Sequence, residues 1–139
     1  MYHPIPEDFD EVVFPTLEEA IYIHDNFALL TGGLAGISKP HDLEGAIGRP
    51  QQAAMYDLEA DFVKIAAYYW HGISTSHGFA DGNKRTGLLV AVAFLEANGF
   101  EVEMEENHPG EMVDAWMASG EFEIPLLDNY LRERTSYLG

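Results

Sequence analysis

The stretch that organises this chain is His77-Gly-Phe-Ala-Asp-Gly-Asn-Lys-Arg-Thr-Gly87, followed directly by the apolar run Leu88-Leu-Val-Ala-Val-Ala-Phe-Leu95. The pattern predicts a loop that leads into the N-terminus of a buried helix. The first backbone N–H groups of a helix have no partner within it and carry a partial positive charge, so they bind anions readily. We therefore expect an anion site at this junction.

Lys84 and Arg85 lie in the first turn of the predicted helix. The helix dipole disfavours cations there by roughly 0.3–1 kcal/mol each, so their presence favours a bound polyanion such as a phosphate chain. Asp81 supplies the kind of carboxylate that holds Mg²⁺ beside phosphate oxygens. His77 is the one side chain of the stretch that exchanges a proton near neutral pH.

A purely structural role explains part of the same pattern. Asp-Gly-Asn is common loop chemistry, and Asp81 or Asn83 can cap the helix. His77 can also be a partly buried histidine bonded to a backbone carbonyl. The chain lacks the Gly-x-x-x-x-Gly-Lys-Ser/Thr spacing of a Walker loop. The residues alone leave both interpretations open.

The stretch resembles the signature of the Fic/Doc (fido) superfamily, His-x-Phe-x-Asp/Asn-Ala/Gly-Asn-Lys-Arg. The form of the motif with lysine at position 84 resembles the Doc, or death-on-curing, branch. Adenylyl-transferring Fic proteins usually carry Gly at that position and a second Arg three residues after the first, where this chain has Leu88. The segments Gly48–Tyr56 and Phe94–Gly99 also look Doc-like.

The resemblance implies a single all-α domain over residues 1–139, a compact fido-type helical bundle with a central buried helix pair and a short β-hairpin flap. It implies a toxin that transfers the γ-phosphate of ATP to a threonine of a translation factor such as elongation factor Tu. AMP transfer of the Fic type and a non-catalytic fido binding module are the alternatives. The region around Gly48, including Arg49, Gln51 and Gln52, forms the flap in this family and is expected to dock the target protein.

The site residues follow from the same resemblance. His77 is expected to be the base that activates the threonine hydroxyl, and Asp81 the ligand of Mg²⁺. The residues expected to bind the nucleotide phosphates are Gly82, Asn83, Lys84 and Arg85. The expected catalytic residues are His77, Asp81, Lys84 and Arg85.

The strongly acidic composition limits the kinds of partner that the protein can bind. Twenty-four acidic residues against seven basic ones give a formal charge of −17, which disfavours direct nucleic-acid binding because a basic face is needed to neutralise phosphates. Either a salt-rich cytoplasm or a basic partner explains the acidity. Family members that inhibit themselves carry Ser/Thr-x-x-x-Glu followed by Gly or Asn. This chain has Ser119-Gly-Glu-Phe-Glu123, but Ile124 follows, so the pattern is incomplete. The resemblance therefore implies a separate Phd-type antitoxin.

Other classes are disfavoured. There is no cysteine, and the six histidines are scattered without metal-ligand spacing, which argues against a metal-dependent hydrolase. No apolar run reaches the length of a membrane span and the N-terminus is not a signal peptide, so we expect a cytoplasmic protein.

Periodicity and turn residues predict six helices. His24 is expected to be a core histidine of the first, and the aromatic cluster at 68–71 to pack in the core. Asn107 is a candidate N-cap of the fifth helix. Gly48-Arg49-Pro50 is expected to break the second helix, and Gln51 to Met55 to be a polar connector. The predicted ranges are approximately 17–30, 43–47, 58–74, 83–98, 109–118 and 124–137.

Overall fold

The structure, a computed structural model, describes residues 2–29, 33–104 and 109–139. The described residues form six α-helices: α1 (Leu17–Ile23), α2 (Pro40–Tyr56), α3 (Phe62–Ser76), α4 (Asn83–Ala97), α5 (Pro109–Ser119) and α6 (Ile124–Arg134). A 3₁₀ turn, η1 (Phe9–Glu11), precedes α1, and a π-helical turn, η2 (His24–Ala28), continues it. Two short strands, β1 (Phe100–Val102) and β2 (Thr135–Tyr137), pair antiparallel with Phe100 opposite Tyr137. The prediction of an all-α fold is confirmed.

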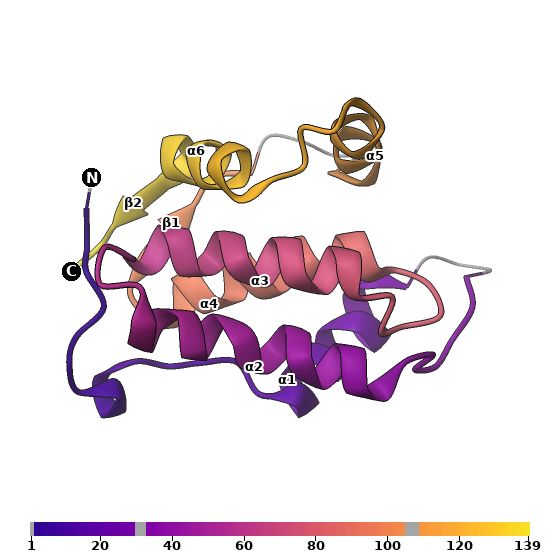
Figure 1. The fold of residues 1–139 in the computed structure, drawn as a ribbon, viewed down its shortest axis with the longest axis horizontal. Helices are drawn as coiled ribbons and strands as arrows, with labels where there is room; N and C mark the ends of the chain where they lie inside the picture. Colours follow the sequence, from indigo (N-terminus) through magenta and orange to yellow (C-terminus); the bar gives the residue numbers. More distant parts are fainter. Residues whose placement is uncertain (1, 30–32, 105–108) are drawn as a thin grey trace.

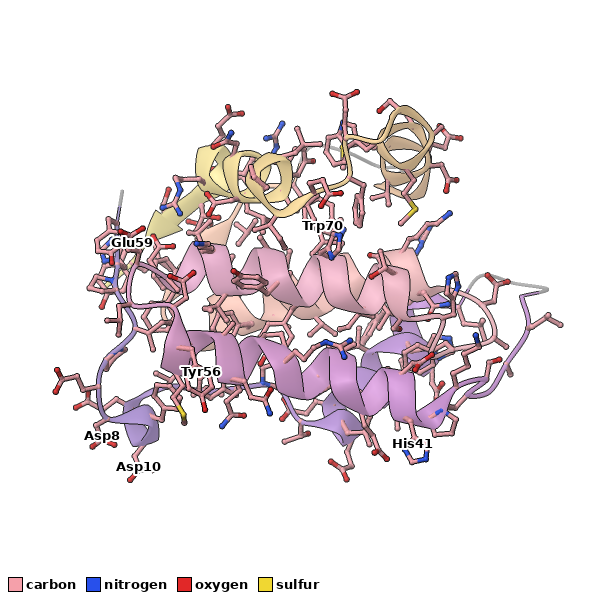
Figure 2. The ribbon with its side chains drawn as sticks, in the orientation of Figure 1. Asp8, Asp10, His41, Tyr56, Glu59 and Trp70 are labelled. Carbon is pink, nitrogen blue, oxygen red and sulfur yellow. The ribbon has the colours of Figure 1, made fainter. Side chains whose placement is uncertain are left out.

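The helices α3 and α4 form the centre of the molecule, with α1 and α2 on one side and α5 and α6 on the other (Figure 1). Both α3 and α4 have apolar residues on most of their circumference, as a central helix requires, and most of these are buried. The exceptions on α4 include Leu89, Val92 and Ala93, which are partly exposed. Trp70 points from α3 toward the α5–α6 layer (Figure 2), where its ring meets the edges of Trp116 and Tyr130. The predicted buried helix pair is thus confirmed.

The prediction of a break at Gly48-Arg49-Pro50 is wrong, because α2 runs without interruption from Pro40 to Tyr56. Pro50 removes one helical hydrogen bond, which costs about 3 kcal/mol in an exposed helix. Its ring, however, is buried on the same face as Leu43 and Ala46. Burial of that face against α3 outweighs the lost bond, so the segment predicted to be a polar connector is helical.

Other boundaries shift by a few residues. The capping box of Thr16 and Glu19 begins α1 as predicted. The last helix ends at Arg134 rather than near Tyr137, because its final residues pair with β1. Asn107 lies outside the described residues.

The loop that joins α3 to α4 lies at the end of the molecule opposite the two termini (Figure 1). At the other end, the N- and C-terminal segments meet through the rings of His3 and Tyr137, whose centroids are 4.4 Å apart. Within the described ranges, no helix combines the length and the apolar run that crossing a membrane requires.

Candidate phosphate-binding site

Close packing of α3 and α4 fixes both ends of the loop. A Cβ atom added to Gly87 would lie 2.6 Å from Ser74 Oγ and 2.7 Å from the Trp70 carbonyl oxygen. No side chain fits between the helices at this point, so Gly87 lets their backbones approach. The first turn of α4 is therefore held against the last turn of α3.

His77 ends α3 in a left-handed conformation, with φ 56° and ψ 24°, which no other described non-glycine residue adopts. Such backbone geometry is costly for a side chain and is often found at functional sites. Ser76 supports it, because its hydroxyl donates to the Ile73 carbonyl at 2.9 Å and accepts from Gly78 N–H at 3.0 Å. The turn leaves the imidazole of His77 exposed at the wall of a cavity.

Asn83 closes the loop with both ends of its amide. Its Oδ1 accepts from Phe79 N–H at 2.9 Å, and its Nδ2 donates to the Phe79 carbonyl at 3.0 Å. The side chain expected to orient phosphate is thus bonded within the loop. Any phosphate contact that Asn83 makes from this conformation uses its backbone N–H group.

His24 of η2 contacts the loop, and nothing in the sequence indicated this contact. Its side chain is fully buried, its ring stacks on Phe79 with centroids 3.8 Å apart, and its Nε2 lies 2.7 Å from the carbonyl oxygen of Asp81. A carbonyl can only accept, so Nε2 donates. The carboxylate of Asp25 lies 2.8 Å from the other ring nitrogen. The expectation of a core histidine is correct, and the structure adds that this histidine positions Asp81.

The N-terminus of α4 is open. Gly82, the residue before the helix, has φ 82° and no capping side chain, and a Cβ atom there would lie 3.3 Å from the Ala28 carbonyl oxygen. The first N–H of α4 with an acceptor in the described ranges is that of Thr86, which donates to the Gly82 carbonyl at 2.9 Å. The N–H groups of residues 83–85 are therefore available to an anion.

A cavity of about 770 Å³ lies over this helix end. The predicted site residues that line it are His77, Asp81, Gly82, Asn83, Lys84 and Arg85. Residues that the sequence did not indicate complete its wall, among them His71, Asp114, Met117 and Glu123. A volume of this size is ordinary for a small-molecule site.

Asp81 suits the single-carboxylate role expected for Mg²⁺. Its side chain is exposed at the cavity, with Oδ1 accepting the Gly82 N–H at 2.8 Å. The described residues contain no group of three side chains able to enclose a metal ion. One carboxylate is nevertheless enough when phosphate oxygens and water complete the coordination, as they commonly do for Mg²⁺.

The three residues expected to dock a target are not at the cavity. Arg49, Gln51 and Gln52 are exposed on α2 and do not line it. Instead, the backbone of residues 36–39 pairs with the loop: Ser38 N–H donates to the Gly78 carbonyl at 2.7 Å, and Ala80 N–H to the Gly36 carbonyl at 3.0 Å. The expected β-hairpin flap is not formed by the segment around Gly48, because packing makes that segment helical.

These features agree with comparisons to known proteins. A family model described as "Fic/DOC family" matches residues 14–95, more than half of the chain. This chain belongs to the Fic/DOC family. It is also similar to "Protein kinase doc" of Escherichia phage P1, with 40% identity over 85 residues, which cover 61% of this chain and 68% of that protein. The family match spans α1 to most of α4, including the loop, and ends before α5.

Proposed function

We propose that this protein is a Doc-like phosphotransferase, which uses the N-terminus of α4 to hold a nucleotide triphosphate and transfers its γ-phosphate to a protein hydroxyl. The observation that carries the proposal is the open helix end with its N–H groups, Lys84 and Arg85 facing one cavity, with His77 on the same wall. Phosphoryl transfer needs mainly positioning and charge stabilisation, and this arrangement supplies both. The similarity to Protein kinase doc supports the γ-phosphate as the transferred group.

His77 is the proposed base. Its exposed imidazole accepts the proton of the attacking threonine hydroxyl while the hydroxyl oxygen bonds to the γ-phosphorus. The bond from that phosphorus to the bridging oxygen breaks, and the nucleoside diphosphate leaves with the electron pair. Lys84, Arg85 and the free N–H groups of α4 stabilise the negative charge that this oxygen gains.

Asp81 is the proposed ligand for Mg²⁺. When bound, Mg²⁺ neutralises phosphate charge. Two hydrogen bonds fix Asp81, since His24 bonds its backbone carbonyl and the Gly82 N–H bonds its carboxylate. A carboxylate held in this way has little freedom to lose when it takes up a ligand.

The biological role proposed with this chemistry is that of a toxin, which acts in the cytoplasm on a translation factor such as elongation factor Tu and is held in check by a Phd-type antitoxin. The large negative charge favours a basic partner segment, since complementary charge speeds encounter. Expression without the antitoxin is expected to arrest growth, and co-expression of the neighbouring gene product to relieve it. Growth unaffected by wild-type expression would count against the toxin role.

Labelled ATP separates the proposal from AMP transfer. The protein is incubated with elongation factor Tu and ATP labelled at either the α or the γ position. We expect label on the factor only from the γ position. Label from the α position alone would assign the protein to the adenylyl-transferring group instead.

A further inference from the structure

Asp114 of α5 forms an ion pair with Lys84 across the cavity wall. The two residues are 30 positions apart, and both side chains are partly exposed, 41% for Lys84 and 59% for Asp114. Lys84 is also one of the two cations at the open end of α4. The lysine that a phosphate chain would use is therefore already bonded to a carboxylate.

The fold places Asp114 at the wall through its neighbours. Val113 is fully buried, and Trp116 packs edge-on against Trp70 of α3. Since these residues fix which face of α5 points inward, Asp114 faces the cavity together with Met117, one turn away. The position of the carboxylate follows from packing that does not involve Lys84.

The charge of the cavity makes this pair important. Among the described residues, three carboxylates line it, from Asp81, Asp114 and Glu123, together with the cations Lys84 and Arg85. Asp81 has a role with Mg²⁺, and Glu123 lies 3.9 Å from His71. Of these three carboxylates, Asp114 is the one that pairs with a cation the proposed reaction needs, so it competes directly with the incoming phosphate.

We propose that Asp114 determines polyphosphate affinity: it holds Lys84 in place in the free protein and must release it when a triphosphate binds. The inference rests on the proposed function. Asp114 lies outside residues 14–95, which the family model matches. In the bound state, the ammonium group of Lys84 pairs with the phosphate chain. The carboxylate of Asp114 is then hydrated by solvent, which its exposure allows.

The test measures binding of inorganic tripolyphosphate by calorimetry at low ionic strength, without any turnover. Asp114→Asn should bind about two- to fivefold more tightly than wild type, which corresponds to about 0.4–1 kcal/mol and lies within the range for exposed ion pairs. Glu111→Gln is the matched control, because Glu111 is exposed on the same helix but does not line the cavity. Its affinity should stay at the wild-type value, and molar salt should remove the gain of Asp114→Asn.

The Lys84→Met variant distinguishes competition between Asp114 and phosphate for Lys84 from general repulsion of phosphate by the Asp114 charge. Lys84→Met should weaken binding by itself, and on this background Asp114→Asn should gain less than it does in the wild type, since no lysine is left to release. Equal or weaker binding by Asp114→Asn in the wild-type background would overturn the inference and leave the phosphate site standing. Failure of the wild type to bind tripolyphosphate, with Lys84→Met no different, would overturn the proposed function together with it.

Discussion

The two ends of the α3–α4 pair each contain a carboxylate–cation pair, and the two pairs differ in burial. At the end near the termini, Asp61 is buried at the start of α3 and receives two hydrogen bonds from the Arg132 guanidinium, at 2.8 and 3.0 Å. At the loop end, Lys84 and Asp114 meet through one contact in a solvent-exposed cavity wall. The same chemistry therefore joins α6 firmly to α3 and α5 only loosely to α4.

The two ends also differ in how many of their backbone N–H groups are hydrogen-bonded. Asp61 also caps α3 by accepting a hydrogen bond from the Lys64 N–H in its first turn. The Phe62 N–H donates to the His3 carbonyl, so two backbone N–H groups at this helix end are paired. The loop end keeps the N–H groups of residues 83–85 without acceptors in the described part of the chain. A buried, paired end holds the helices in place while the open end remains able to bind.

The largest expected effect concerns the open end. His77→Asn should reduce phosphate transfer by about 10²- to 10⁴-fold, because general-base catalysis contributes on that scale. Asparagine tolerates the left-handed backbone of this position, so thermal unfolding should stay close to that of the wild type. Transfer at the wild-type rate would remove His77 from the mechanism.

Asp61→Asn tests the buried end. It removes the negative charge that pairs with Arg132 and leaves the bonds to Asp128, and we expect the unfolding free energy to fall by roughly 3 kcal/mol, the lower part of the range for breaking a buried pair. Urea titration measures the loss. The folded fraction should still bind tripolyphosphate with wild-type affinity, and a loss of affinity at full folding would mean that the two ends are coupled.

His24 connects the core to the open end. His24→Gln places an amide N–H near the position of Nε2, so it should keep much of the bond to the Asp81 carbonyl, whereas His24→Leu removes it. We expect kcat to fall about tenfold in His24→Leu and to recover in part in His24→Gln, from the loss of one hydrogen bond and of Asp81 placement. Equal losses in the two variants, matching their losses of stability, would reduce His24 to a packing residue.

The buried end should also control stability in acid. Burial alone would raise the pKa of Asp61, but hydrogen bonds from Arg132 and from Lys64 N–H outweigh it and hold that pKa below 3.8. A carboxyl whose pKa is lower in the folded than in the unfolded chain stabilises the fold above the unfolded value. That stabilisation is lost as the pH falls through the lower, folded value.

Unfolding free energy should therefore be nearly constant from pH 7 to about pH 5 and decline below about pH 4, with a shallower decline in Asp61→Asn. Asp57, whose pKa is lowered chiefly by its hydrogen bond from Lys64, contributes in the same direction and remains in the variant. Identical acid profiles for wild type and variant would contradict the assignment.

The sequence predicted the open end better than its surroundings. Local signals were sufficient for α3, α4 and the loop, since apolar periodicity and glycines such as Gly82 act within a few residues. They failed for α2, where burial of Pro50 overrides its usual effect. They also missed His24 and Asp114, because contacts across 57 and 30 positions depend on how helices pack. His24 contacts the loop and Asp114 pairs with Lys84, so the position of the cavity was predictable from the sequence, whereas the distant residues that surround it were not.

The most direct test of the account is mass spectrometry of elongation factor Tu from cells that express the wild type or His77→Asn without an antitoxin. We predict a gain of one phosphate on the factor with the wild type and no gain with the variant. A gain of one nucleotide, or an unmodified factor in growth-arrested cells, would contradict γ-phosphate transfer to this target from the N-terminus of α4.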